Sequence, residues 1–190
     1  MAYTNVVGVR QYLDVASSGD DALIGDLIDR AQAAIDEYCF RTFEATADST
    51  RYFDYSNERI DGATLWLYDE VCSITTVTNG DGTEVTAGQY TTIPRNETPY
   101  YKIRILSNSG VSWTYTDEWM DAISITGRWA FSTTAPKDIV QACDRLAAFY
   151  YKQRDQPMMD VTAIEAGVVL APVGLPVDVR QILNPRVKKA

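Results

Sequence analysis

The sequence predicts an α+β fold in which a small bundle of about three helices packs with an antiparallel sheet and an extended C-terminal arm follows. Near both ends of the chain, apolar residues recur at three- and four-residue steps, the spacing of an amphipathic helix. Between residues 51 and 129, short runs rich in Thr, Tyr, Val, Ile and Trp alternate with Gly, Asn, Asp and Pro, as antiparallel strands do. Prolines then punctuate residues 157–190 and deny that segment a long helix.

Three helices are predicted, over residues 5–14, 20–40 and 136–154. In the second, apolar side chains share one side of the helix while acidic and basic ones occupy the other, the apolar set being Ile24, Leu27, Ile28, Ala31, Ile35 and Tyr38. The third begins with Pro136, which suits the first helical position because that amide would have no partner in the helix.

Five or six strands are predicted within residues 51–129, and the candidate segments are 51–55, 64–68, 74–78, 89–93, 102–106 and 122–127. The Asn-Gly-Asp-Gly run at residues 79–82 predicts a tight turn, because these residue types tolerate positive φ. The predicted organisation is a core over residues 1–156 and an interaction arm over residues 157–190, with a brief helix at 177–183.

The composition excludes several classes of protein. The chain has 190 residues and a net charge of -9 from 26 acidic and 17 basic residues, the wrong sign for holding nucleic acid by neutralising phosphates. No apolar stretch approaches the roughly 18 residues that cross a bilayer, and the first residues lack the order of a signal peptide. We therefore expect a soluble protein, made in a cytoplasm, with no membrane contact.

The residues that usually carry catalysis or metal binding are scarce. The sequence contains no histidine, which removes Ser-His-Asp and Cys-His arrangements and the commonest metal ligand. Cys39, Cys72 and Cys143 are odd in number and far apart, so they indicate neither a disulfide framework nor a zinc site. We therefore expect no enzymatic activity and no cofactor.

Two weaker chemical interpretations remain open. The adjacent acids Asp20-Asp21, Asp69-Glu70 and Asp117-Glu118 resemble the paired carboxylates of a hydrolase. Because neighbours in sequence seldom face the same cleft, we favour a helix cap for the first pair and solvated loops for the others. Asn79, Asp81 and Glu84 resemble part of a calcium loop but lack its distal acid, which favours a hairpin turn.

Aromatic residues gather in the predicted strands and suggest a stacking platform for single-stranded nucleic acid. The residues concerned are Tyr52, Phe53, Tyr55, Trp66 and Tyr68. Without interleaved Lys and Arg, we interpret them instead as sheet core and cross-strand pairs.

The order of elements carries a family resemblance. Matching segments are residues 21–24 with 33–36, residues 71–77 leading into Asp81-Gly82 and Tyr90, and residues 123–129 with 135–139. In this order, over about residues 4–155, the chain resembles the head-tail connector (adaptor) family of tailed phages. It departs from the family in a longer insert at residues 107–119 and in its extended arm.

The resemblance implies a structural virion protein that forms a ring, commonly of twelve copies, beneath the portal protein of the head. A stopper or tail-completion protein would follow below, and DNA would pass through the lumen without sequence-specific binding. Twelve chains at -9 each carry -108, and like charges would let DNA slide without being held. Another neck or tail-completion protein is the alternative.

Two segments are predicted to bind partners. The arm carries apolar residues whose burial offsets, almost without surplus, the backbone entropy lost when one arm becomes ordered. Many arms on one ring act together, which favours docking on the portal or on an adjacent subunit. The predicted contacts there are Val168, Val169, Leu170, Val173, Leu175, Val179, Ile182, Leu183 and Arg186. The insert at residues 107–119 adds Trp113 and Tyr115, which are too apolar for an idle loop.

Overall fold

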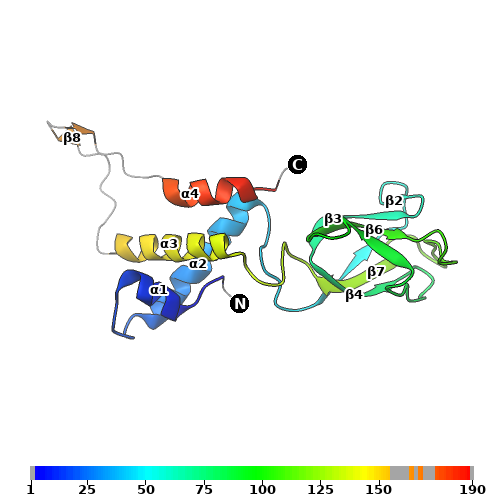
Figure 1. Cartoon of the computed structure of the whole chain (residues 1–190), viewed down its shortest axis with the longest axis horizontal. Coiled ribbons are helices and arrows are strands. Elements are labelled where there is room, and N and C mark those ends of the chain that lie inside the picture. The colour runs from blue at the N-terminus through cyan, green and yellow to red at the C-terminus, as the bar shows by residue number, and fades with distance from the viewer. Residues whose placement is uncertain (1–2, 155–162, 165–166, 169–173, 189–190) are drawn as a thin grey trace. The chain divides into compact units, whose positions relative to one another are not determined.

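The computed structural model describes residues 3–154, 163–164, 167–168 and 174–188. Along these residues the chain passes through two helices, seven strands, a third helix, a short hairpin and a fourth helix (Figure 1). The predicted α+β class is confirmed. Contacts divide the chain into two compact units: residues 1–41 with 135–190, here the helical unit, and residues 42–134, the sheet unit.

The helical unit consists of α1 (Val6–Leu13), α2 (Asp21–Cys39), α3 (Lys137–Gln153) and α4 (Val177–Leu183), followed by a 3-10 turn at Asn184–Arg186. Every predicted helix is present to within one residue at each end. Asn5 caps α1, because its side chain accepts a hydrogen bond from the Gly8 amide at 2.9 Å and so satisfies an amide that the helix leaves unpaired. Pro136 lies at the N-cap of α3, one position before the predicted place.

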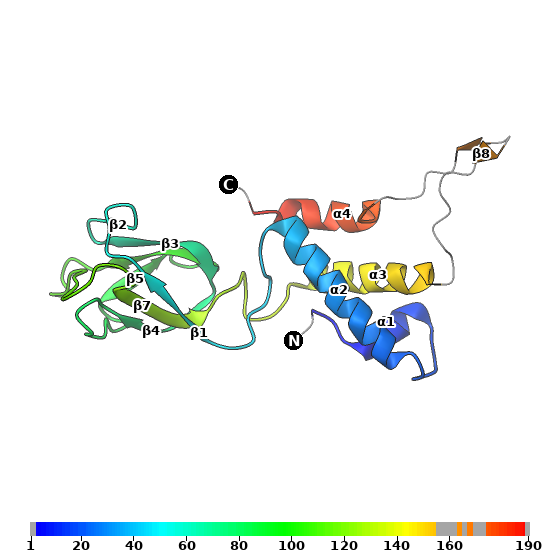
Figure 2. The same cartoon turned by 180° about the vertical axis from the view of Figure 1, so that it is seen from behind.

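The core of the helical unit lies around α3, which contacts each of the other three helices (Figures 1 and 2). Val9 of α1, Ile28 and Ile35 of α2, and Leu146 of α3 are almost wholly buried. Leu183 of α4 is also fully buried, so the last helix completes this core. Each such side chain stabilises the unit by about 1.5–3 kcal/mol relative to an exposed position.

The sheet unit consists of two antiparallel sheets. Its strands are β1 (Ser49–Phe53), β2 (Ile60–Asp61), β3 (Thr64–Val71), β4 (Ser73–Thr78), β5 (Tyr90–Ile93), β6 (Tyr100–Ile105) and β7 (Ile123–Arg128). One sheet has the order β1-β7-β4 and the other β2-β3-β6-β5. All six candidate strands are present. Only the two-residue β2 was not predicted, because so short a strand leaves no periodic pattern.

The core of the sheet unit is built from alternate residues of its strands, as the period of two requires. Leu65 and Leu67 of β3, Ile103 of β6, and Ile123 and Ile125 of β7 are almost wholly buried in one apolar cluster. The helices and the strands therefore each have a core of their own.

The C-terminal segment contains two further elements. The strands β8 (Ala163–Ile164) and β9 (Gly167–Val168) pair as an antiparallel hairpin, and α4 follows over the same residues as the predicted brief helix. Contacts group residues 135–190 with residues 1–41, a division that the sequence did not predict. A separate function for residues 157–190 stays a prediction. No helix among the described residues is long and apolar enough to span a membrane.

Candidate functional site

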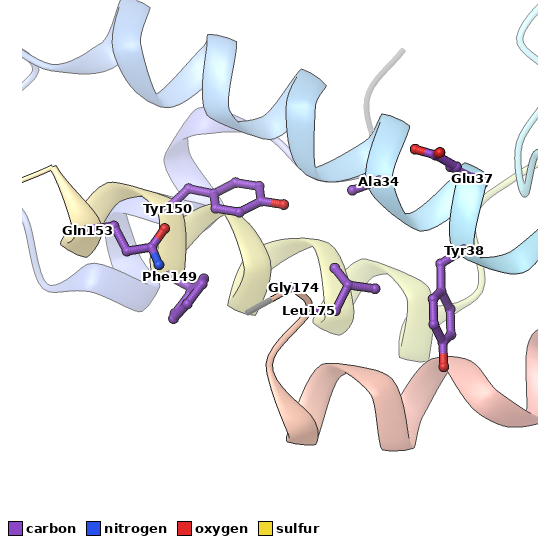
Figure 3. Close-up of a pocket in the computed structure, with 8 residues that line it drawn as sticks. All are labelled: Ala34, Glu37, Tyr38, Phe149, Tyr150, Gln153, Gly174 and Leu175. Atoms are coloured by element: carbon purple, nitrogen blue, oxygen red, sulfur yellow. The ribbon is translucent and has the colours of Figure 1, made fainter. Parts of the chain in front are cut away.

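The helical unit carries an open groove of about 490 Å³ between α2, α3 and the residues that precede α4 (Figure 3). Its walls are mainly aromatic and aliphatic, and its lining residues are Ala34, Glu37, Tyr38, Phe149, Tyr150, Gln153, Gly174 and Leu175. Glu37 is the only charged residue among them. Aromatic and aliphatic walls of this kind suit apolar contacts.

Contacts far apart in the sequence hold α4 beside this groove. The Tyr38 hydroxyl donates to Oδ1 of Asn184 at 2.6 Å. Arg186 pairs with Asp138 at 2.8 Å, and Asp178 pairs with Arg145 at 3.0 Å. Such half-exposed ion pairs contribute little free energy individually, so the buried side chains of α4 supply most of the attachment.

The predicted contact residues of the arm therefore differ in what they can offer a partner. Val179 and Leu183 are fully buried against this chain's own helices. Leu175 and Ile182 are partly buried, and Arg186 is in the ion pair with Asp138. Val168 lies in β9. Val169, Leu170 and Val173 lie outside the described residues. Partner binding by this set stays a prediction, and Val179 and Leu183 are inaccessible to a partner in this structure.

The insert at residues 107–119 is fastened to the sheet unit. Trp113 is only 5% exposed, and its indole Nε1 donates to the carbonyl oxygen of Ala63 at 2.9 Å. Tyr115 is 43% exposed, with its ring centroid 4.9 Å from that of Tyr55. Of the two predicted contact residues, Trp113 fills the core and Tyr115 remains at the surface.

The run at residues 79–82 forms the predicted turn and also holds the insert. The Gly82 amide donates to the Asn79 carbonyl oxygen at 2.9 Å, and Gly82 has a φ of 80°. The buried Asn79 side chain donates to the Ser112 carbonyl oxygen and accepts from the Thr114 amide. Asn79 is thus committed to hydrogen bonds inside the sheet unit, which favours the hairpin turn over a calcium loop.

The adjacent acids point to local partners. Asp20 occupies the N-cap of α2, but its side chain accepts no bond from the helix amides. It accepts instead from the Tyr151 hydroxyl at 2.5 Å, and this bond and the nearby Arg154 hold its pKa below the usual range. Glu70 is buried and accepts from the Tyr101 hydroxyl at 3.1 Å.

Asp69 and Glu118 of the adjacent acids also have local partners, and the thiols of Cys39 and Cys143 are buried. Asp69 pairs with Arg51, and Glu118 accepts from two amides of its own turn. Burial raises the pKa of Cys39 to about 11 and that of Cys143 to about 12, which leaves almost no thiolate at neutral pH. Within the described residues, no three His, Cys, Asp or Glu side chains gather to hold a metal ion.

A surface that the sequence analysis missed lies on the outer face of the four-stranded sheet. Nζ of Lys102 lies 3.4 Å from the ring centroid of Trp66. The guanidinium carbon of Arg59 lies 4.5 Å from the ring centroid of Tyr68. The Trp66 and Tyr68 rings stack with their centroids 6.4 Å apart. Cations are thus interleaved with aromatics after all, because register places β6 beside β3.

The alternation of these residues along their strands was the signal from which the sequence could have predicted this surface. Trp66 and Tyr68 are two positions apart, as are Lys102 and Arg104, and residues with that spacing share one face of a strand. We call Arg59, Trp66, Tyr68, Lys102 and Arg104 the cation-aromatic face.

The comparisons with known proteins bear on the fold as a whole. No family model matches the sequence, and no curated protein matches it. Among solved structures, a chain in the neck of an empty GTA particle, computed with C6 symmetry, matches with a TM-score of 0.59 at 18% identity, over 97% of this chain and 89% of that one. This chain shares the fold of that neck protein.

Two further structures agree. A chain in the neck of the native GTA particle, computed with C12 symmetry, has a TM-score of 0.58 at 20% identity, over 97% of this chain and 88% of the other. A chain in the virion of the native gene transfer agent (GTA) particle has a TM-score of 0.53 at 19% identity, over 97% and 89%. A match of this extent takes in both units.

Proposed function

We propose that this chain is a structural, non-enzymatic subunit of a phage-like virion neck. In this proposal it forms a ring between the portal of the head and the tail or stopper protein, and the ring leaves a conduit for DNA. The observation that carries the proposal is the fold shared over 97% of the chain with chains in necks computed with C6 and C12 symmetry. Rotational symmetry of this kind describes closed rings of identical copies, and we propose twelve.

The distribution of charge supports a conduit that does not hold DNA. The sheet unit contains 13 acidic and 6 basic residues, a net charge of -7, whereas the helical unit contains 13 acidic and 11 basic residues, a net charge of -2. Repulsion between like charges reaches roughly 8 Å at physiological salt. An acidic lining within that distance would repel the phosphates of a passing duplex.

The environments of the reactive groups support the absence of catalysis in this proposal. Asp20 accepts from Tyr151, Asp69 pairs with Arg51 and Glu70 accepts from Tyr101, whereas a glycoside hydrolase requires two carboxylates that flank one cleft.

Ring formation tests the proposal directly. The purified chain is examined by light scattering at increasing concentration and by negative-stain imaging, first alone and then with the portal protein of the same particle. The expected result is a closed ring in at least one of the two states. A chain that stays monomeric both alone and with the portal contradicts the proposal.

The proposed contribution of the C-terminal segment has a separate test. Truncation after residue 156 would remove the buried Val179 and Leu183 and disturb the helical core. The sharper variant replaces Val168, Val169, Leu170 and Val173 by Ser and keeps α4. We expect an unchanged far-UV circular dichroism spectrum and at least tenfold weaker binding to the portal or to the neighbouring copy. Unchanged binding would exclude these residues from the contact.

A further inference from the structure

The cation-aromatic face is unusual for the unit that carries it. The sheet unit has a net charge of -7, yet Arg59, Lys102 and Arg104 lie together on one of its faces. Among the described residues, none of these three side chains forms an ion pair. Trp66 and Tyr68 beside them are 36% and 56% exposed. The face therefore combines unneutralised cations with large apolar surface.

The geometry of this face is fixed before any partner arrives. Lys102 lies directly opposite Trp66 in the antiparallel register, and Arg104 lies opposite Thr64. The Tyr68 hydroxyl donates to the Glu58 carbonyl oxygen at 2.9 Å, which holds the ring over which Arg59 lies. Side chains that are already ordered lose little entropy on binding, and aromatic and Arg side chains dominate the energetics of protein contacts.

The same unit exposes a loop of opposite character. In residues 115–121, which we call the acidic loop, Asp117, Glu118 and Asp121 are exposed. Trp119 and Met120 between them are 46% and 54% exposed. Glu118 accepts from the amides of Trp119 and Met120 at 2.9 and 3.2 Å, so the loop is locally ordered. Carboxylates beside apolar side chains complement cations beside aromatic rings in both charge and hydrophobicity.

We propose that the cation-aromatic face is an interface between copies of this chain and that it binds the acidic loop of the next copy. The inference rests on the proposed ring. A rotational ring requires two different, complementary surfaces on each copy, because the contacts run head to tail. The face and the loop form such a pair on one unit.

Nucleic acid fits the same face less well. Duplex DNA offers no unstacked bases to aromatic rings, and three cations neutralise few phosphates. The few carboxylates of a loop match the small number of cations on this face better than the densely spaced charges of a phosphate backbone do.

The test uses two variants of the full chain, studied in the state in which the wild type forms rings, alone or on its portal. The face variant carries Lys102→Glu and Arg104→Glu, and the loop variant carries Asp117→Lys and Trp119→Ser. We expect each variant alone to lose ring formation, with at least tenfold weaker self-association. Mixed in equal amounts, the two should form pairs and stop there, because each supplies the one surface that the other lacks.

A control that is charge-matched to the face variant carries Arg30→Glu and Lys137→Glu. These two residues are exposed on the helical unit, and their replacement changes the net charge by the same amount as the face variant does. It should assemble as the wild type does. All four tryptophans lie in the sheet unit, so tryptophan fluorescence verifies that the face variant remains folded. The loop variant lacks Trp119, and its folding is verified by the fluorescence of Trp66, Trp113 and Trp129.

The outcomes separate the two proposals. If the wild type forms no ring in either state, the proposed function fails. If the wild type forms rings and the face variant does so equally well, only the inference about the face is wrong. The inference is also overturned if the control loses assembly to the same extent, or if the face variant assembles normally but loses binding to DNA.

Discussion

The helical and sheet units differ in how their buried and exposed side chains are arranged. In the helical unit the buried stripes of all four helices meet around α3, and ion pairs such as Arg186 with Asp138 connect segments distant in sequence. In the sheet unit a closed core coexists with six exposed large apolar side chains, namely Tyr52, Trp66, Tyr68, Tyr115, Trp119 and Met120. The helical unit exposes four such side chains, namely Val7, Tyr12, Phe40 and Val177, and in the sheet unit the exposed aromatics Trp66 and Tyr68 lie beside cations, as they do in surfaces that a partner covers.

The two units also offer separate spectroscopic signals. All four tryptophans belong to the sheet unit, so tryptophan fluorescence follows that unit alone. Circular dichroism at helical wavelengths follows mainly the helical unit, which contains α1 to α4. Each comparison below can therefore be assigned to one unit, whether or not the chain unfolds in a single transition.

The largest effect is expected where the insert enters the sheet core. Trp113→Ala removes a buried indole and its hydrogen bond to Ala63, and should lower the free energy of unfolding of the sheet unit by about 3–5 kcal/mol. Tyr115→Ala, at a partly exposed ring, should cost below about 1 kcal/mol. Urea unfolding followed by fluorescence measures both. Equal effects would contradict the division of this insert into a core residue and a surface residue.

The next effect tests whether α4 belongs to the helical core. Leu183→Ala should destabilise the helical unit by about 2–5 kcal/mol, because the side chain is fully buried and leaves a cavity. Val177→Ala in the same helix is the matched control, since Val177 is 58% exposed, and it should have little effect. Urea unfolding followed by circular dichroism gives the comparison. A neutral Leu183→Ala would mean that α4 is detached in solution.

The sequence predicted elements well and contacts between elements poorly. The helices α2 and α3 carry long apolar stripes, so their bounds could be predicted to within one residue. The role of Trp113 could not, because its partner, the carbonyl of Ala63, is 50 residues away. A loop of Ser, Asn, Gly and Thr around an aromatic residue has the same pattern whether that residue is buried or exposed.

The cation-aromatic face shows the same limit. Trp66 and Lys102 meet only through the pairing of β3 with β6, and a shift of that register by one residue would place them on opposite faces. Val179 and Leu183 form a stripe of only two residues, which does not distinguish a helix packed on its own chain from one that waits for a partner. Register and packing are tertiary facts that local patterns leave open.

The smallest effect expected is a pH dependence in the helical unit. Burial raises the pKa of Asp36 to about 6, although the hydrogen bond donated by Tyr3 opposes the rise. An unfolded aspartate titrates near 3.9, so the folded chain holds this proton more tightly. The resulting stability is fully present below about pH 4 and is lost as the pH rises through about 6.

Replacing Asp36 by Asn removes the titration but keeps an oxygen that accepts from Tyr3. A shift of about two units corresponds to roughly 2.7 kcal/mol at 1.36 kcal/mol per unit, and partial solvent exposure reduces this to about 1 kcal/mol. Between pH 4.5 and pH 7.5 the free energy of unfolding of the wild type should therefore fall by about 1 kcal/mol more than that of the variant. Urea unfolding followed by circular dichroism measures this difference. Burial also raises the pKa of Asp144, so some slope of the same sign should remain.

Tyr3→Phe should move the loss of stability to higher pH, because it removes the bond that lowers the pKa of Asp36. If Asp36→Asn leaves the difference between the two pH values unchanged, this carboxyl is solvated and α2 does not bury it against the N-terminal residues.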